Sequence, residues 1–311
     1  AVVMIISLLT FTQTQKSLGS IGVSPLMTTP VAKRRIYEWL TYAISVALVP
    51  VMIILVSQTA YTDAFMFIIG PLAILYLLYE MRNFSAAENK KLVAALIFMV
   101  FSIFFWAFFE QSGGSLSLFA MNNLESDFFG VTLDPNGVNN SSNSLFVIVF
   151  ATFVGLAWLY LGKYKLEPNT VVKFGLGFLF LAGGFYIFYY TKFLANSAGL
   201  TSLEWFTLGW FVITFGELCL SPIGMSAMTR LSPQKTQAVV MGMWFLASAY
   251  GQYIAGLLGA GISEDSKNMS NLEKLTVYAD GYKDLAIYGL VAGILLILFS
   301  PLIKKLMGDV K

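Results

Sequence analysis

The sequence is poor in the side chains on which most catalytic and metal chemistry depends. It contains no histidine, and its single cysteine, Cys219, lies inside an apolar stretch. A disulfide framework, a CxxC metal site and a histidine-ligated metal are therefore excluded. Because histidine is absent, any proton transfer by this chain has to use carboxylates.

Charged residues are also scarce. They make up 12% of the 311 residues, against 57% hydrophobic residues, and the mean hydropathy is +0.74. These values exclude an ordinary soluble domain, and the net charge of +2 gives no indication of a nucleic-acid partner. Apolar runs of about twenty residues recur without the alternation of an outer-membrane strand, so we predict an all-α membrane protein with several spans, in contact with membrane lipid.

The first residues are apolar but too few to span a bilayer. The opening AVVMIISLLTF lacks the basic region and cleavage motif of a signal peptide. We interpret it as the end of a helix that begins further upstream, which would make the chain a fragment. A connection rich in Gly, Ser and Pro follows, and then the basic cluster Lys33–Arg35.

Eight apolar segments come next. The first two, Tyr37–Gln58 and Ala64–Met81, are joined by a short polar link and are predicted to form a membrane hairpin. The other six candidate spans are Lys91–Met121, Ser144–Leu161, Val171–Leu194, Leu203–Arg230, Thr236–Ile262 and Tyr282–Ile303.

The basic residues test the orientation of these spans. When the Lys33–Arg35 side is assigned to the cytoplasm and the spans alternate, fifteen of the nineteen Lys and Arg residues fall inside. The four that fall outside are Lys192, Lys267, Lys274 and Lys283. The positive-inside rule therefore supports this orientation, which places the C-terminus in the cytoplasm.

One carboxylate, Glu217, stands near the middle of the apolar stretch Leu203–Arg230. An uncompensated acid at the bilayer centre costs about 2.5–3.5 kcal/mol on insertion scales, so such acids usually face a bundle interior or a water-filled cavity. Pro222, with Gly216 and Gly224 on either side, predicts a bend or hinge in this helix. The alternative is a carboxylate that is paired to a neighbouring helix only for packing.

A second acid, Glu110, lies in the apolar stretch FFWAFFEQSGGSLSLFA, where Gly113 and Gly114 lower helix stability and permit bending. No Lys or Arg lies at membrane depth to pair with either acid, and two unpaired acids would cost about 5 kcal/mol together. Their cationic partners must therefore come from a substrate or from another part of the protein. Burial favours the protonated acid and an approaching cation favours the carboxylate, so such a group can exchange a proton for a bound cation.

Three ordered motifs resemble the C-terminal half of the proton-dependent oligopeptide transporters. They are the FFEQSGGSLSLFA region within Phe105–Ala120, GELCLSPIGMSAMTRLSP at Gly216–Pro233 and VMGMWFLASAYGQYIAG at Val240–Gly256. The early GSIGVSP at Gly19–Pro25 and the extra hairpin are similar to the bacterial branch. The first five helices of the family, most of the sixth, the ExxER-type motif and an intramembrane lysine have no counterpart in this sequence.

The resemblance implies roles for individual residues. Glu217 corresponds to the acid that receives the N-terminal ammonium of a peptide, and Glu110 to a proton-binding acid that pairs with an arginine of the N-terminal half. Asn143 takes the place of a peptide-binding asparagine, although Ser144 stands where the family usually has proline. Ser221 and Trp244 match pocket positions, and Trp106 lies one turn before Glu110. Aromatic walls suit varied side chains, but lipid-facing positions are the alternative for these tryptophans.

Several small residues have a structural explanation. Close packing of helices is the expectation for Gly242, Ser248, Gly251 and Gly256, and for Gly175, Gly177, Gly183 and Gly184.

The resemblance also implies an architecture and an activity. Residues 1–12 would form the end of a sixth transmembrane helix, and residues 13–36 a cytoplasmic connection. Residues 37–81 would form the hairpin, and residues 91–311 the six-helix C-terminal bundle of a major-facilitator fold. The expected function is inward symport of di- and tripeptides with protons, without another cofactor, in the bacterial inner membrane, with the N-terminal bundle as partner. A carrier for another small solute, a membrane channel or scaffold, and a membrane enzyme are the competing hypotheses, the last without a nucleophile or metal motif to support it.

Overall fold

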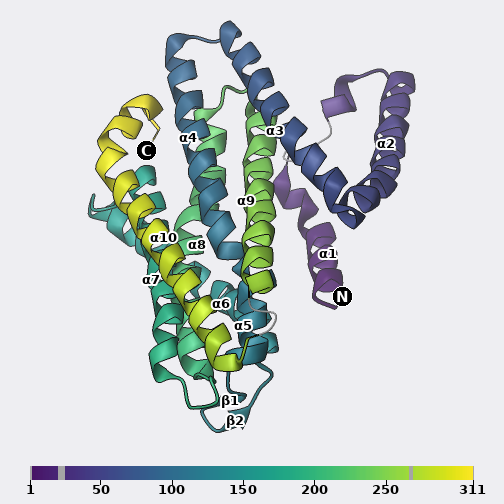
Figure 1. Cartoon of the computed structure of the whole chain (residues 1–311). Helices are drawn as coiled ribbons and strands as arrows, with labels where there is room; N and C mark the ends of the chain where they lie inside the picture. Colours follow the sequence, from purple (N-terminus) through teal and green to yellow (C-terminus); the bar gives the residue numbers. More distant parts are fainter. Residues whose placement is uncertain (1, 20–24, 266–268, 311) are drawn as a thin grey trace. The chain divides into compact units, whose positions relative to one another are not determined.

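The computed structural model describes residues 2–19, 25–265 and 269–310 of the chain (Figure 1). The chain divides into two compact units, Ala1–Pro71 and Leu72–Lys311. Within the described residues, eight helices are long and apolar enough to cross a membrane. The prediction of a helical membrane protein with eight apolar spans is confirmed.

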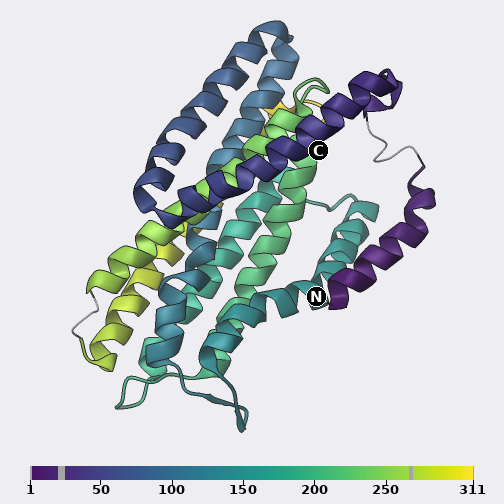
Figure 2. The ribbon, with the colours of Figure 1, turned by 90° about the vertical axis from the view of Figure 1, so that its right-hand side faces the viewer.

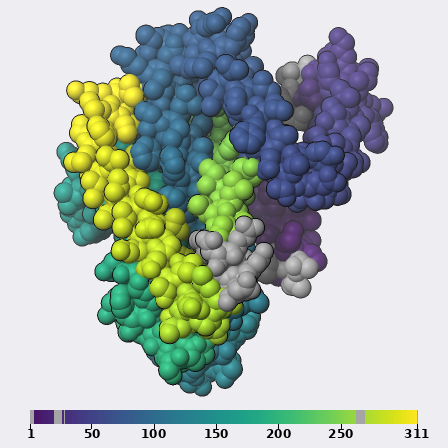
Figure 3. Space-filling view, viewed as in Figure 1, coloured from purple at the N-terminus to yellow at the C-terminus, as the bar shows by residue number. Residues whose placement is uncertain are grey.

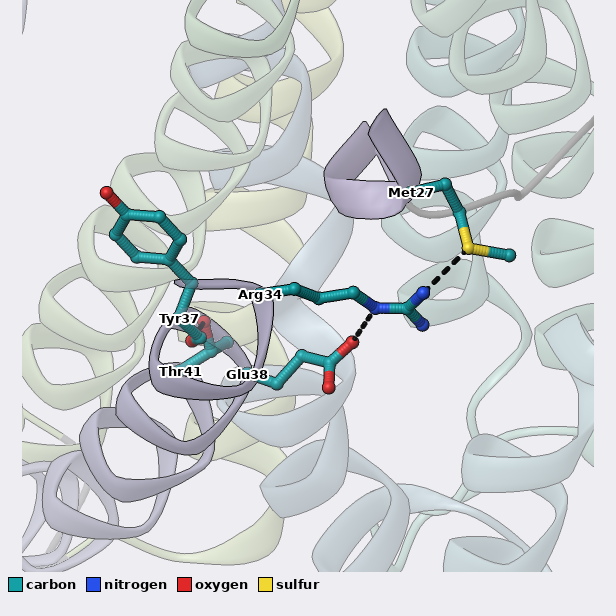
Figure 4. A network of polar contacts seen from close by, with 5 residues as sticks. All are labelled: Met27, Arg34, Tyr37, Glu38 and Thr41. Carbon is teal, nitrogen blue, oxygen red and sulfur yellow. Dashed lines mark hydrogen bonds and ion pairs between the residues drawn. The ribbon is translucent and has the colours of Figure 1, made fainter. Parts of the chain in front are cut away.

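The first unit holds the helices α1 (Val2–Thr14) and α2 (Val31–Ser57) and the first half of α3 (Thr59–Glu80). Near the start of α2, Arg34 Nε donates to Glu38 Oε1 at 2.7 Å, and Arg34 Nη1 contacts the Met27 sulfur at 2.9 Å (Figure 4). A partly exposed pair of this kind, one helical turn apart, stabilises a helix by about 0.3–0.5 kcal/mol. The centre of the GSIGVSP motif, residues 20–24, lies outside the described residues.

The second unit is the larger bundle and contains both intramembrane acids. Its helices are α4 (Ala86–Phe109), α5 (Ser115–Asn123), α6 (Pro135–Lys163), α7 (Thr170–Tyr190), α8 (Leu203–Leu231), α9 (Gln237–Asp265) and α10 (Asn271–Met307). Between α5 and α6 the strands β1 (Asp127–Phe128) and β2 (Val131–Thr132) pair antiparallel. Helix α7 packs between α8 and α10, α4 packs on α9 and α10, and α6 packs on α8. In the space-filling view, α10 lies along α4 on the face shown (Figure 3).

In the second unit, three helices begin at least five residues earlier than hydropathy predicts. The spans predicted from Lys91, Ser144 and Tyr282 begin instead at Ala86, Pro135 and Asn271. Each start has a capping side chain on the preceding residue: Ser85 and Ser270 form capping boxes with Glu88 and Glu273, and Asp134 accepts a hydrogen bond from the Gly137 N–H at 2.7 Å. These caps satisfy backbone N–H groups at the helix start, so the helices extend into polar sequence.

The expected bend around Glu110 is present. Helix α4 ends at Phe109, a 3-10 turn covers Glu110–Gly113, and α5 starts only at Ser115. By contrast, α8 continues as one α-helix through Pro222. A hinge at that proline therefore stays a prediction.

Glycines allow α7 to approach both of its neighbours closely. A Cβ atom on Gly177 would lie 3.0 Å from the Gly216 carbonyl oxygen, and one on Gly184 would lie 2.7 Å from the Gly209 carbonyl oxygen, both in α8. On the side of α10, a Cβ on Gly175 would lie 3.0 Å from the Gly293 carbonyl oxygen. The packing role predicted for Gly175, Gly177 and Gly184 is confirmed, and Gly183 makes an ordinary contact with Val212.

The small residues of α9 behave less uniformly. A Cβ on Gly251 would lie 2.4 Å from Trp106 Cβ, so this glycine lets α9 approach α4 closely, as predicted. At Gly242 and Gly256 a Cβ would meet nothing within 4 Å among the described residues, so their packing role stays a prediction. The Ser248 hydroxyl donates within its own helix, to the Trp244 carbonyl oxygen at 3.4 Å.

A substitution tests this packing. In Gly216→Ala the new Cβ would lie 2.6 Å from the Gly177 carbonyl oxygen and 3.2 Å from the Leu181 nitrogen, which are backbone atoms that cannot move aside alone. We expect a loss of about 1–3 kcal/mol of stability, as for other overpacked positions, measured as a lower thermal unfolding midpoint of the purified chain.

Gly155→Ala is the matched control, since a Cβ at Gly155 meets nothing within 4 Å. The removal of a helical glycine should leave the midpoint of this variant unchanged or slightly raised. Equal midpoints for the two variants would contradict the packing role of Gly216.

Candidate functional site

The first acid of the site, Glu217, lies on α8 and faces Asn143 of α6. Asn143 Nδ2 donates to Glu217 Oε2 at 2.8 Å and to Thr214 Oγ1 at 3.3 Å. All three lie in the second unit, with Thr214 fully buried and the other two half-buried. The structure therefore brings together two residues that the resemblance assigns to one peptide site.

Aromatic packing sets the position of Asn143 relative to α8. One and two turns beyond Asn143, Phe146 and Phe150 pack on Phe211, with ring centroids 5.4 and 5.3 Å apart, and Phe150 also packs on Phe215. These contacts fix the face of α6 that meets α8. Asn143 can therefore reach the Glu217 carboxylate without a change in backbone conformation.

The second acid, Glu110, opens the 3-10 turn after α4. Its Oε1 accepts a hydrogen bond from Gln252 Nε2 of α9 at 3.2 Å. The neighbouring Gln111 is fully buried and donates to the carbonyl oxygens of Ala107 and Ala255 at 3.1 and 3.4 Å. The inward side chain of Gln111 thereby fixes the turn against α9 and leaves the half-buried Glu110 beside Gln252.

Both residues of the site are carboxylic acids, so ionisation of one disfavours ionisation of the other. In the part of the chain that the structure describes, the ion pairs between Lys or Arg and Asp or Glu include neither acid. Uncharged amides, Asn143 and Gln252, are their hydrogen-bond donors. A site with this arrangement favours a bound cation or proton, because either removes the repulsion.

Asn139 connects the segment of Glu110 with that of Glu217. This residue is buried, with 1% of its surface exposed; its Nδ2 donates to the Ser112 carbonyl oxygen at 3.0 Å and its Oδ1 accepts from Trp210 Nε1 at 3.2 Å. The Trp210 carbonyl oxygen in turn accepts from Thr214 Oγ1 at 2.8 Å. These hydrogen bonds connect the turn of Glu110, through the indole and the backbone of Trp210, to the side chains around Glu217.

The predicted pocket residues occupy different surroundings. Ser221 lies one helical turn after Glu217 on the same face of α8 and is half-buried. Trp106 is half-buried one turn before Glu110, edge-on to Phe105 and Phe109, and its Nε1 is buried without an acceptor among the described residues. A substrate role for both stays a prediction.

Trp244 is buried, with 2% of its surface exposed. Its ring covers Gly224, where a Cβ would lie 2.2 Å from Trp244 Cη2, and it packs edge-on to Phe174. The structure thus gives Gly224 and Gly216 packing partners, while Pro222 is exposed on α8. The pocket role of Trp244 and the hinge role of Pro222, Gly216 and Gly224 stay predictions.

Sequence reasoning did not single out Gln252, Thr214, Asn139 or Trp210. The usable signal was an amide inside an apolar span, since buried polar side chains need hydrogen-bond partners. That signal marks Gln252 as a polar position of interest, whereas Asn139 lies in the polar stretch Pro135–Asn143 and gives no such signal. The signal does not show which acid Gln252 would approach, because the pairing depends on the packing of helices far apart in the sequence.

Comparison with known proteins places the whole chain in one group. The family model PTR2, described as the POT family, matches residues 1–275. The peptide transporter YePEPT of Yersinia enterocolitica is 31% identical over 304 residues, which cover 94% of this chain and 57% of that protein. A di-/tripeptide transporter of Lactococcus lactis subsp. cremoris is 30% identical, with coverage of 90% and 56%.

Solved structures give the same result. A peptide transporter described as POT, in a mutant form in complex with alafosfalin, superposes with a TM-score of 0.72 at 29% identity. The match covers 98% of this chain and 60% of that one. The same transporter in complex with sulfate gives a TM-score of 0.70 with equal coverage. The chain therefore spans somewhat more than half the length of the relatives that it matches.

Proposed function

The chain belongs to the POT family of membrane transporters, and on this premise we propose that it forms the C-terminal part of a carrier that moves di- and tripeptides into the cell together with protons. The chain is a multi-pass membrane protein that aligns with about 60% of solved POT transporters. Membership of a transporter family argues against the membrane enzyme considered from the sequence. Relatives named as peptide or di-/tripeptide transporters support the substrate class.

The observation that carries the proposal is the pair Asn143–Glu217, with Nδ2 and Oε2 2.8 Å apart and no basic side chain paired to the acid in the described part of the chain. In the proposal, Glu217 receives the N-terminal ammonium of the peptide. Asn143 holds the carboxylate in place and offers its remaining hydrogen-bonding capacity to the peptide backbone. Ser221, Trp244 and Trp106 complete the pocket.

Glu110 is the proposed proton site. It lies at the break between α4 and α5, where the short 3-10 turn can adjust more easily than a continuous helix. Its charge has the same sign as that of Glu217, so the ionisation of one acid opposes that of the other. Proton binding at Glu110 removes this repulsion. The protonation state of one acid can then follow the occupancy of the other.

The finer architecture is part of the same proposal. The second unit would be the six-helix C-terminal bundle of a major-facilitator fold, α2 and α3 the linker hairpin, and α1 the end of a sixth transmembrane helix. The substrate site would close against an N-terminal bundle, and alternating access would rock one bundle against the other. The excess of Lys and Arg on one side supports a cytoplasmic position for that side and for the C-terminus, and the proposed location is the bacterial inner membrane.

Uptake of labelled dialanine tests the proposal. Proteoliposomes that contain only this chain should show no saturable uptake, because the enclosed midplane site needs two bundles. Co-expression with the N-terminal bundle should give saturable uptake that an inward proton gradient drives and a protonophore abolishes. Saturable, proton-driven uptake by this chain alone would contradict the proposal, as would a complete carrier that ignores dipeptides.

A further inference from the structure

A cavity of about 1330 Å³ lies in the second unit, and neither Glu110 nor Glu217 lines it. It is lined by α6, the α6–α7 connection, the start of α7, the second half of α8 and the end of α10. No residue of α9 or of the 3-10 turn after α4 lines it, whereas the acid site is built from that turn and from α6, α8 and α9. The proposed transport function therefore leaves this cavity unexplained.

The cavity exists because α6 packs on α8 along only part of its length. The aromatic contacts of Phe146 and Phe150 hold the first half of α6. Beyond them, Val154, Gly155 and Trp158 face the cavity, and Figure 2 shows this half of α6, in teal, standing apart from α7 and α8. The walls at this depth are apolar, with Leu218 and Ile223 on the side of α8.

The mouth of the cavity lies at the ends of α6, α8 and α10 and at the start of α7, and it is rich in cations. Four basic and two acidic side chains line the cavity. The two acidic side chains of the cavity lining have partners. Glu167 pairs with Lys173, which also lies over the Trp158 ring, and Asp309 pairs with Lys91. The hydrogen bond from Lys91 lowers the pKa of the Asp309 carboxyl.

Three cations at the mouth remain available to a ligand. Lys165, Arg230 and Lys304 are exposed, and none forms an ion pair with a carboxylate of the described residues. Deeper in the cavity, Trp158 Nε1 is a buried donor without an acceptor in the described part of the chain. The site therefore offers positive charge at the level of the helix ends, and below it an apolar channel with one free N–H donor.

We propose that this cavity binds an anionic glycerophospholipid, with its phosphate headgroup on Lys165, Arg230 and Lys304 and an acyl chain along the wall of α6 and α8. The order of the lining matches an amphipathic lipid, since the cations lie at the membrane surface and the apolar residues at membrane depth. Basic pockets between transmembrane helices bind anionic headgroups in this way, and each Lys or Arg near the surface contributes about 1 kcal/mol to such binding. A soluble polypeptide would match the charges but not the apolar channel beneath them.

Lipid binding by native mass spectrometry tests the proposal. The purified chain is titrated with phosphatidylglycerol or with phosphatidylcholine of the same acyl chains. We expect a preference for phosphatidylglycerol that falls about fivefold for each cation removed, as about 1 kcal/mol per charge implies, in Arg230→Gln and in Lys304→Gln. Lys305→Gln is the matched control: it removes the same charge from the next residue of α10, which is exposed and does not line the cavity.

A second variant tests the apolar channel without a change of charge. Gly155→Trp should fill the space beside α6, because a Cβ at Gly155 meets nothing within 4 Å, and should lower phosphatidylglycerol binding. The proposal is overturned if Lys304→Gln and Lys305→Gln lower the preference equally, if Gly155→Trp binds as the unsubstituted chain does, or if inorganic phosphate displaces the lipid. The last result would assign the cations to a soluble anion.

Discussion

Replacement of Glu217 by glutamine in the complete transporter is expected to weaken dipeptide binding by about 2–5 kcal/mol, the cost of removing one partner of a buried charge pair. The amide keeps the shape of the side chain and can still accept the hydrogen bond that Asn143 Nδ2 donates across 2.8 Å. What it loses is the negative charge opposite the peptide ammonium. Isothermal titration calorimetry with dialanine measures the difference.

Two controls separate this role from a structural one. Glu204→Gln makes the same substitution at the outer end of the same helix, where the carboxylate bonds Ser202 and the Phe129 N–H, and it should leave the affinity unchanged. An N-acetylated dipeptide has no ammonium group, so its weaker binding should be insensitive to Glu217→Gln. An unchanged affinity for dialanine, or an equal loss for the acetylated peptide, would show that Glu217 does not bind the ammonium.

Hydropathy predicted the spans well and their starts poorly, for a physical reason. The stretch from Pro135 to Asn143 is polar, and so is most of Asn271–Gly281, so neither raises a hydropathy window. Both are nevertheless helical, because Asp134 and Ser270 cap the first turn and helix propagation adds a backbone hydrogen bond for each further residue. The Asp-Pro and Ser-x-x-Glu signals predict these starts when they are given the same weight as hydropathy.

The acids of the site could be found from the sequence because a charge is rare in an apolar span. Their neighbours were harder to find. Gln252 lies 142 residues from the acid that it contacts and Asn143 lies 74 from its own, so their pairing depends on how helices pack. For Trp244 the sequence shows the residue type but not the orientation. A tryptophan suits a pocket wall, but whether it faces a pocket or covers Gly224 depends on the rotation of α9 relative to α8.

Replacement of Glu110 by glutamine should separate proton coupling from peptide binding. A neutral amide resembles the protonated acid because it carries no charge, but it cannot release a proton. The carrier should therefore still bind peptide and exchange it across the membrane in either direction. Net uptake against a gradient should be lost, because no proton crosses with the peptide.

Proteoliposomes allow peptide exchange and gradient-driven uptake to be measured on one preparation of the complete transporter. In Glu110→Gln, counterflow of labelled dialanine against internal unlabelled dialanine should persist, while uptake driven by an imposed pH gradient should fall to background. Glu125→Gln, in the connection after α5, is the control: its carboxylate bonds Asn196 far from the bundle interior, so both activities should remain. Gradient-driven uptake at the unsubstituted rate would show that Glu110 is not the proton site. If counterflow is lost as well, Glu110 supports the bundle or the peptide site, since the chain of hydrogen bonds through Ser112, Asn139 and Trp210 links its turn to the surroundings of Glu217.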